Sequence, residues 1–252
     1  MHKITIEICC GSAEDVSESK KNGADRVELN SCLFLGGLTP SLGELTIARK
    51  TDIEIITMTR PRGGGFCYTK TEYENALLDA KYFLNNGADG IAFGFLNKDG
   101  SIDEERCKRM LDVIGDHQSV FHRAFDVVPN WKTSMDTLCK LGVSRVLTSG
   151  QHATALDGAE AIKEMIDYSA GRIQILPGSG INANNAESLI KTTGCTQIHA
   201  GLRKTSHDCS SNCNPAIHFI ESVHPSEDQY SMTNGGKVRD LRKATNSIHT
   251  GE

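Results

Sequence analysis

The sequence predicts an α/β protein, a (β/α)8 TIM-like barrel formed by a single domain over residues 1–252. Eight short apolar segments alternate along the chain with stretches that have the spacing of amphipathic helices. The length of 252 residues fits this fold, because such barrels commonly have about 250 residues. An open doubly wound sheet usually has fewer strands, so the number of segments favours the closed barrel.

Each predicted strand is an apolar or alternating run that stops at glycine, proline or a polar turn. The eight runs cover residues 4–9, 26–29, 53–58, 90–96, 119–126, 145–147, 173–176 and 197–200. The fifth run, SVFHRAFD, carries His122, Arg123 and Asp126 in and after its apolar part. Buried strands rarely hold unpaired charge, and barrels bind ligands at the carboxyl ends of their strands, so this segment indicates a functional site.

The helices between these strands are predicted from their ends. Ser12 with Asp15, and Thr71 with Glu74, match the capping-box pattern at a helix start. Glycines shortly before the second, fourth and sixth strands fit the C-terminal caps of the preceding helices. The repeating unit is therefore a strand, a loop and a helix.

The repeat fails at about residues 204–234, which are polar. We expect an insertion or a partner contact there. A helical pattern returns at Val238 and Leu241, which predicts the last helix of the barrel.

The composition is that of a soluble protein with a large core: 38% hydrophobic residues, 23% charged residues and a net charge of -5. This acidic balance disfavours a nucleic-acid partner. The first residues lead straight into a strand, and no apolar run has the length of a membrane span, so we expect a cytoplasmic protein without a membrane partner. The nine cysteines are scattered, which indicates reduced thiols rather than a disulfide framework.

Charged side chains fall at the ends of several predicted strands, and all these ends share one rim of a barrel. The candidate catalytic residues are Glu7, Glu28, Arg60, His122, Arg123, Asp126 and His199. Mutual proximity at a low-dielectric rim would shift carboxyl and imidazole pKa values toward neutrality and permit acid–base chemistry. Strand alternation also puts Cys9 on the face of Glu7 and Asn30 on the face of Glu28.

A structural role is the alternative for the same residues. Glu28 would then pair with Arg60 or Arg123 in an ion-pair network, and His122 would be a satisfied core residue. Alternation predicts that His122 and Asp126 share one face of the fifth strand. We favour function for the set as a whole because so many titratable groups converge.

Two loops have the composition of anion sites. The loop RPRGGG joins Arg60 and Arg62 to three glycines, so its guanidinium groups could hold an anionic substrate. Gly178 and Gly180 lie after the seventh strand, where many barrels bind a phosphate group. Ser149, after the sixth strand, is a further candidate for substrate binding. Glycine-rich turns are as often simple tight connections, and the arginines could equally form a solvated or subunit-contact surface.

Six motifs between about residues 4 and 202 closely resemble those of the CutC copper homeostasis family. They are GADRVEL (23–29), GGLTPS (36–41), RPRGG (60–64), FHRAFD (121–126), RVLTSG (145–150) and PGSGI (177–181). The resemblance implies a TIM-barrel-like cytoplasmic protein, commonly a homo-oligomer such as a dimer or tetramer. It also implies a link to copper handling and, as in some members, binding of Cu(I) through cysteine.

The cysteine positions of the family map onto Cys9 and onto position 30, which is Asn30 in this chain. Cu(I) is a soft ion that prefers thiolate or thioether ligands, so an asparagine amide is a poor substitute. Cys32 keeps the parity of position 30, whereas Cys10 points to the face opposite Cys9. We therefore expect Cys9 and Cys32 to be the metal ligands.

Three functions follow as hypotheses. The first is copper homeostasis, with thiolates at the barrel mouth binding Cu(I). The second is an enzyme of unknown reaction that acts by acid–base chemistry on a small anionic metabolite, such as a phosphorylated one. The third is an assembly module whose polar segment at 204–234 recruits a partner. That segment also offers a weak metal-binding pattern in His207, Cys209 and Cys213.

Overall fold

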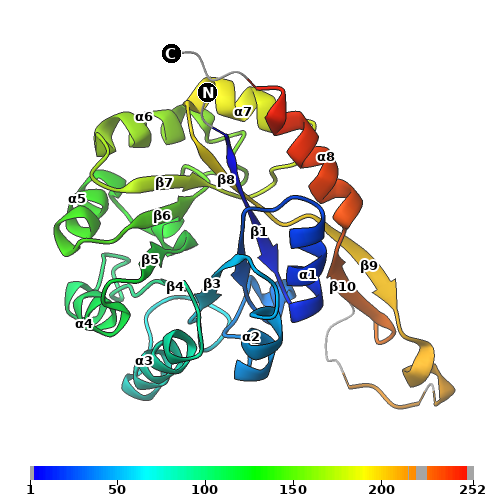
Figure 1. Ribbon diagram of the computed structural model, residues 1–252. Coiled ribbons are helices and arrows are strands. Elements are labelled where there is room, and N and C mark those ends of the chain that lie inside the picture. Colours follow the sequence, from blue (N-terminus) through cyan, green and yellow to red (C-terminus); the bar gives the residue numbers. More distant parts are fainter. Residues whose placement is uncertain (1–2, 215, 220–225, 249–252) are drawn as a thin grey trace.

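The computed structural model of the protein describes residues 3–214, 216–219 and 226–248, and its main body is a barrel of parallel strands surrounded by helices (Figure 1). The strands follow the order β7-β6-β5-β4-β3-β2-β1-β8. The ends of this sheet meet through a parallel bridge between Gly178 and His199, so the barrel is nearly closed. The predicted (β/α)8 fold is confirmed.

The eight barrel strands lie close to their predicted positions. They are β1 (Thr5–Cys10), β2 (Arg26–Leu29), β3 (Glu54–Met58), β4 (Gly90–Phe93), β5 (Gln118–Phe121), β6 (Arg145–Thr148), β7 (Gln174–Pro177) and β8 (Gln197–Ala200). The fourth and fifth strands are shorter than predicted. After Phe93 the chain enters a loop in which Leu96 bridges to Ile102, and after Phe121 it turns into a short helix.

Eight α-helices and three short 3-10 helices are found in the described residues. The α-helices are α1 (Ala13–Lys21), α2 (Leu42–Ala48), α3 (Lys70–Asn85), α4 (Glu104–Ile114), α5 (Trp131–Leu141), α6 (Ala159–Ser169), α7 (Ala186–Thr193) and α8 (Gly235–Asn246). The 3-10 helices are η1 (Leu33–Leu35), η2 (Arg123–Val127) and η3 (Cys209–Cys213). Within the part of the chain that is described, none is long and apolar enough to cross a membrane.

The helix caps follow the sequence with one correction. Ser12 caps α1, because its side chain accepts a hydrogen bond from the backbone N–H of Asp15. The predicted box of Thr71 and Glu74 is wrong: α3 starts earlier, and Thr69 and Glu72 form the reciprocal capping box. The sequence TKTEYE contains two Thr-x-x-Glu pairs in overlapping registers, so the pattern alone does not fix the start.

The interior of the barrel is apolar on one side and polar on the other. A small apolar cluster inside the barrel contains Ile56, Met58, Ala92, Val120, Leu147 and Leu176, all from β3 to β7. Strands β1, β2 and β8 instead place buried charged residues on the same inner face. The larger apolar core lies between the sheet and the helices, and it stabilises a barrel that holds charges in its centre.

The polar segment predicted at 204–234 contains regular structure that the sequence did not indicate. Strands β9 (Arg203–His207) and β10 (Gln229–Thr233) form an antiparallel ribbon, which extends beyond the barrel beside α8 (Figure 1). Most of its side chains are exposed or half-buried, so it lacks the apolar alternation by which a strand is recognised. The backbone N–H of Thr233 donates to Asp15 Oδ1 at 2.6 Å, which ties the ribbon to α1.

Candidate functional site

Three neighbouring strands bring a thiol, a carboxyl group and an imidazole together at the mouth of the barrel. The register pairs Cys9 of β1 with Glu28 of β2, and Glu7 of β1 with His199 of β8. One ligand atom from each of Cys9, Glu28 and His199 lies within 4.8 Å of the other two. Glu28 is only 3% exposed and His199 only 7%, so these groups interact in a medium of low dielectric constant.

Glu7 holds the imidazole of His199 from below. His199 Nδ1 lies 2.7 Å from Glu7 Oε1, and Arg26 Nε donates to the other carboxylate oxygen of Glu7. Burial raises the pKa of Glu7, but the Arg26 charge and the His199 hydrogen bond outweigh it and hold this pKa far below its usual value. Burial lowers the pKa of His199, but contacts with Cys9, Glu7 and Glu28 raise it well above its usual value. Because Nδ1 is engaged with Glu7, Nε2 remains for a ligand.

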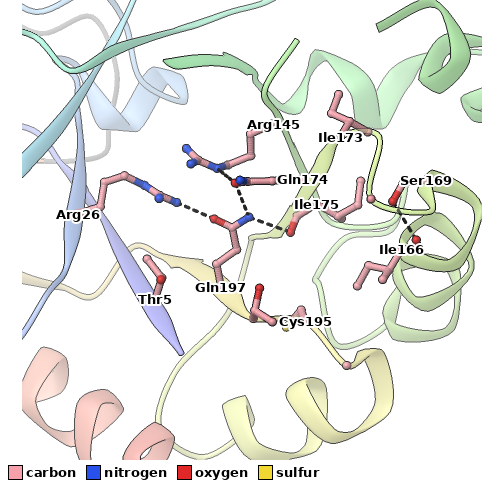
Figure 2. A pocket seen from close by; sticks show the side chains of 13 residues that line it. Thr5, Arg26, Arg145, Ile166, Ser169, Ile173, Gln174, Ile175, Cys195 and Gln197 are labelled. Carbon is pink, nitrogen blue, oxygen red and sulfur yellow. Dashed lines mark hydrogen bonds between the residues drawn. The ribbon is translucent and has the colours of Figure 1, made fainter. Parts of the chain in front are cut away.

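A hydrogen-bond network beneath Glu7 fixes Arg26 in turn. Arg26 Nη2 donates to Gln197 Oε1 at 2.8 Å, and Gln197 Nε2 donates to Gln174 Oε1 at 3.3 Å (Figure 2). Arg145 Nε donates to the same Gln174 oxygen at 3.1 Å. These residues line a cavity of about 450 Å³ at the amino-terminal end of the strands. The carboxylate of Glu7 is therefore held in place by Arg26 and by side chains at the amino-terminal end of the barrel.

Asn30 supports Cys9 and Glu28 from the carboxyl end of β2. Its Nδ2 donates to Glu28 Oε2 at 3.0 Å and to Cys9 Sγ at 3.6 Å. Cys9 Sγ lies 3.8 Å from the same Glu28 oxygen. Burial raises the pKa values of both the Cys9 thiol and the Glu28 carboxyl group. Glu28 Oε1 is buried without a hydrogen-bond partner in the described residues, so an acceptor atom of the cluster is left for a ligand.

A cavity of about 460 Å³ opens above the cluster. Residues from other strand ends and loops also line it, among them Met58, Arg60, Phe66, His122, Arg123, Asp126, Ser179, Gly180 and Arg203. The structure thus brings all seven predicted catalytic residues to the region of one mouth, six of them in the lining and Glu7 directly beneath it. Gly180 lines the cavity. Gly178 pairs with His199 where the barrel closes, and a Cβ added to Gly178 would lie 2.6 Å from the side chain of Leu147.

His122 is a buried neutral residue. Its Nδ1 accepts the backbone N–H of Ala124 at 3.2 Å, and its ring centroid lies 5.0 Å from that of Phe66. Burial, together with the nearby charge of Arg60, lowers its pKa to about 3. His122 Nε2 has no partner among the described residues. At neutral pH the ring can therefore donate one hydrogen bond to a ligand, but it is not a protonated acid.

Asp126 holds two loops together. The predicted common strand face of His122 and Asp126 is wrong, because the chain leaves β5 at Phe121 and turns into η2. Asp126 accepts hydrogen bonds from Thr148 Oγ1 at 2.5 Å and from the backbone N–H of Ser149 at 3.0 Å. Arg123 Nε donates to Asp126 at 2.7 Å, and Ser149 Oγ at 3.0 Å. These contacts give Arg123, Asp126 and Ser149 a structural role.

The guanidinium groups of Arg60 and Arg62 bind carbonyl groups of their own loops. Arg60 Nη1 donates to Leu35 O at 2.8 Å and to Gly37 O at 3.0 Å, while Nη2 donates to Gly64 O at 2.9 Å. Arg62 pairs with Glu72 at 2.7 Å. The alternative ion pair of Arg60 with Glu28 is not found among the described residues, whereas the anion-holding role of the two arginines stays a prediction. Both arginines instead shape the rim.

The structure does not bring Cys32 into the cluster. Cys32 is exposed and is the N-cap residue of η1, with a φ of 46°. Because the extended backbone of β2 ends before Cys32, the alternation of side chains along that strand does not apply to it. His207, Cys209 and Cys213 are exposed on β9 and η3. Cys9, Glu28 and His199 are the one group of potential metal ligands found in the described ranges.

Sequence reasoning missed three residues of the site. Arg26 lies at the start of β2 on the face of Glu28, so alternation could have indicated it. Met58 ends β3 and faces the mouth cavity. Arg203 is the first residue of β9, three positions after β8 ends, and a basic residue shortly after a barrel strand was the available signal.

Fold and site together define a (β/α)8-barrel protein with a buried thiol–carboxyl–imidazole centre at its mouth. The family model for the CutC family matches residues 4–204. This chain belongs to the CutC family.

Relatives of the chain agree with this assignment. A CutC family protein of Treponema denticola is 50% identical over 92% of this chain and 95% of its own length. The copper homeostasis protein cutC homolog of Homo sapiens is 37% identical over 96% of this chain and 89% of its own length. The crystal structure of a CutC protein from Streptococcus agalactiae has 32% sequence identity and a TM-score of 0.75, and the match covers 78% of this chain and 98% of that one.

Proposed function

We propose that this protein acts in copper homeostasis and binds one copper ion at Cys9, Glu28 and His199. The observation that carries the proposal is the convergence of these three ligand atoms within 4.8 Å at the base of the mouth cavity. The relatives from human and mouse are named copper homeostasis proteins, which supports copper as the ion.

The donor set favours Cu(I) over a hard cation. Thiolate and imidazole are ligands that Cu(I) accepts, and the thioether of Met58 lines the same cavity. Cys9 would bind through Sγ and His199 through Nε2, while the Glu28 carboxyl group would complete the site. Glu7 would accept the Nδ1 proton of His199, the usual outer-sphere partner of a metal-binding histidine.

Copper binding at this centre has to displace protons. The metal-free thiol of Cys9 and imidazole of His199 both have raised pKa values. A metal binds the thiolate and the neutral imidazole, so proton release accompanies binding. The affinity should therefore rise with pH, and we expect the measured number of released protons to fall in the Cys9→Ser variant.

A competition titration with a chromogenic Cu(I) chelator under anaerobic conditions tests the proposal. We expect one tight site in the parent protein, a large loss of affinity in Cys9→Ser and an unchanged affinity in Cys32→Ser. Cys32 is the matched control because it is exposed and lies outside the cluster. Equal affinities of the parent and Cys9→Ser would contradict the proposal, and a loss confined to Cys32→Ser would move the site to η1.

A second candidate function is acid–base catalysis on a small anionic metabolite. The specific observation that favours it is the His199–Glu7 pair beside the perturbed carboxyl group of Glu28, under a cavity large enough for a small molecule. A thermal-shift screen of metal-free protein with small phosphorylated and carboxylated compounds tests it. A hit should be lost in His199→Gln, and a hit that persists in that variant would count against catalysis at this centre.

We also propose that the protein works in the cytoplasm as a homo-oligomer. Large apolar side chains are exposed on α2 and α3, among them Ile47 at 56% and Tyr82 at 54%, and burial of such residues is a common source of subunit association. Light scattering after size exclusion should give a mass above that of one chain. A monomer at working concentrations would remove this part of the proposal.

A further inference from the structure

A second cavity, of about 520 Å³, adjoins the mouth cavity. It is lined by the loops that follow β7 and β8 and by the first two turns of α8. Gly180, Gly201 and Arg203 line both cavities, so these residues form a shared wall. A ligand held at this wall can reach from one cavity into the other.

Arg203 supplies an unpaired positive charge at the shared wall. The guanidinium group of Arg203 lies beside the backbone of Gly201, since a Cβ added to Gly201 would lie 3.7 Å from Arg203 Nη2. Among the described residues, Arg203 forms no ion pair. Lys237 also lines the second cavity and is anchored by a hydrogen bond from Nζ to the Arg203 carbonyl oxygen at 3.0 Å. Asp240 is the one carboxylate in the lining, so cationic side chains outnumber it.

The loop after β7 presents backbone donors to the same region. Ser179 and Gly180 both have positive φ, 86° and 74°. This conformation is uncommon for serine, and the neighbouring loop imposes it: Ser179 Oγ donates to Ala153 O at 2.9 Å, and the N–H of Ala155 donates to Ser179 O at 3.0 Å. The N–H groups of Gly180, Ile181 and Gly201 have no acceptor within the described chain, so they are available to a ligand.

We propose that this second cavity binds the phosphate group of a phosphate monoester whose remaining part extends past Arg203 toward Cys9 and His199. An arginine fork and backbone N–H groups without an acceptor suit the geometry and charge of a phosphate group. The loops after the seventh and eighth strands are also where (β/α)8 barrels hold phosphate groups. The proposal goes beyond copper homeostasis, because it requires no metal.

Isothermal titration of metal-free protein with inorganic phosphate and with glycerol 3-phosphate tests the inference. We expect saturable one-site binding that weakens as salt increases, and tighter binding of glycerol 3-phosphate because its body enters the mouth cavity. Arg203→Gln should weaken binding about tenfold or more, the effect of losing a charge-assisted hydrogen bond. Lys204→Gln is the matched control: it removes the same charge from the next residue of β9, whose exposed side chain points to the other face of the ribbon.

Lys237→Gln provides a second test that does not depend on how Arg203→Gln folds, because Lys237 is exposed. We expect it to weaken phosphate binding severalfold. Absence of saturable binding, or equal losses in Arg203→Gln and Lys204→Gln, would overturn the site. Equal affinity for the two probes would overturn the extension toward Cys9. Copper affinity should be unchanged in Lys237→Gln, because Lys237 lines the second cavity and not the mouth cavity, so failure of this inference is distinguishable from failure of the copper proposal.

Discussion

Nδ1 of His199 lies 2.7 Å from Oε1 of Glu7 in the centre of the barrel, where Glu7 is 1% exposed. The two residues are separated by 192 positions in the sequence and become neighbours only because β1 pairs with β8. This pair fixes the orientation of the imidazole ring, which lies beside Cys9 and Glu28, and leaves Nε2 free of Glu7. The chemistry proposed for the mouth depends on it.

Replacing Glu7 with glutamine should lower copper affinity without removing a ligand. The amide keeps the shape of the side chain but loses the negative charge that makes His199 a stronger donor, and loss of such an outer-sphere partner typically costs about 10–100-fold in metal affinity. The Cu(I) competition titration measures this change. Glu54→Gln is the control, since Glu54 contacts the far side of Arg26 at 3.8 Å and does not touch His199. Equal effects of the two substitutions would show that Glu7 has no special part in the site.

Arg26→Met should strongly destabilise the fold. The substitution keeps much of the side-chain volume but leaves the buried carboxylate of Glu7 without its guanidinium partner, and breaking a buried ion pair costs about 3–5 kcal/mol. Urea unfolding monitored by circular dichroism measures the free energy of unfolding. Arg172→Met is the comparison, because Arg172 and Asp136 are about half exposed and solvent-screened pairs of this kind contribute little to stability. Similar losses in both variants would contradict the account of Glu7.

His122 should make the stability of the protein depend on pH below neutrality. Its pKa in the folded state is about 3, against 6.5 for an unperturbed histidine, so between these values the unfolded chain binds a proton that the folded chain does not. The contribution of His122 is fully present above pH 6.5 and declines as pH falls, by up to about 1.4 kcal/mol per pH unit.

The comparison of the parent protein with His122→Asn isolates this effect from other titrating groups. Asparagine offers an oxygen to the backbone N–H of Ala124 but does not titrate. We expect the free energy of unfolding of the parent to fall relative to that of the variant between pH 7 and pH 5. A difference that stays constant with pH would mean that His122 is not held neutral by burial.

Arg60→Lys should loosen the rim while leaving the barrel intact. Lysine keeps the charge but cannot reach the three carbonyl groups of Leu35, Gly37 and Gly64 together. We expect a loss of about 1.5–3 kcal/mol in stability and faster hydrogen exchange at residues 33–38 and 61–66. Exchange in β1 and β2 serves as the internal reference. Unchanged exchange in both loops would show that Arg60 is not their main constraint.

Much of the centre could be predicted from the sequence because it lies on regular strands. Within β1 and β2 the alternation of side chains placed Glu7, Cys9 and Glu28 on one face, and closure of the barrel then brought His199 beside them. These inferences required only the strand positions and the fold class. Arg26 was missed, although its position at the start of β2, on the same face as Glu28, was open to the same reasoning.

Residues in loops could not be placed in this way. Asp126 and Cys32 were assigned by strand parity, but one lies in η2 and the other precedes η1 with a positive φ. The partners of Arg60 are backbone carbonyl groups, which leave no pattern in side-chain identity. The ribbon of β9 and β10 was not predicted, because strands that are exposed on both faces lack the alternation of apolar and polar residues by which a strand is recognised.

X-ray absorption at the copper edge of the Cu(I)-loaded protein tests the central claim most directly. We predict a sulfur contribution that disappears in Cys9→Ser and an imidazole contribution that disappears in His199→Gln, each with the other retained. A copper site that keeps its sulfur in Cys9→Ser, or that shows no imidazole in the parent protein, would contradict the metal centre proposed at the mouth of the barrel.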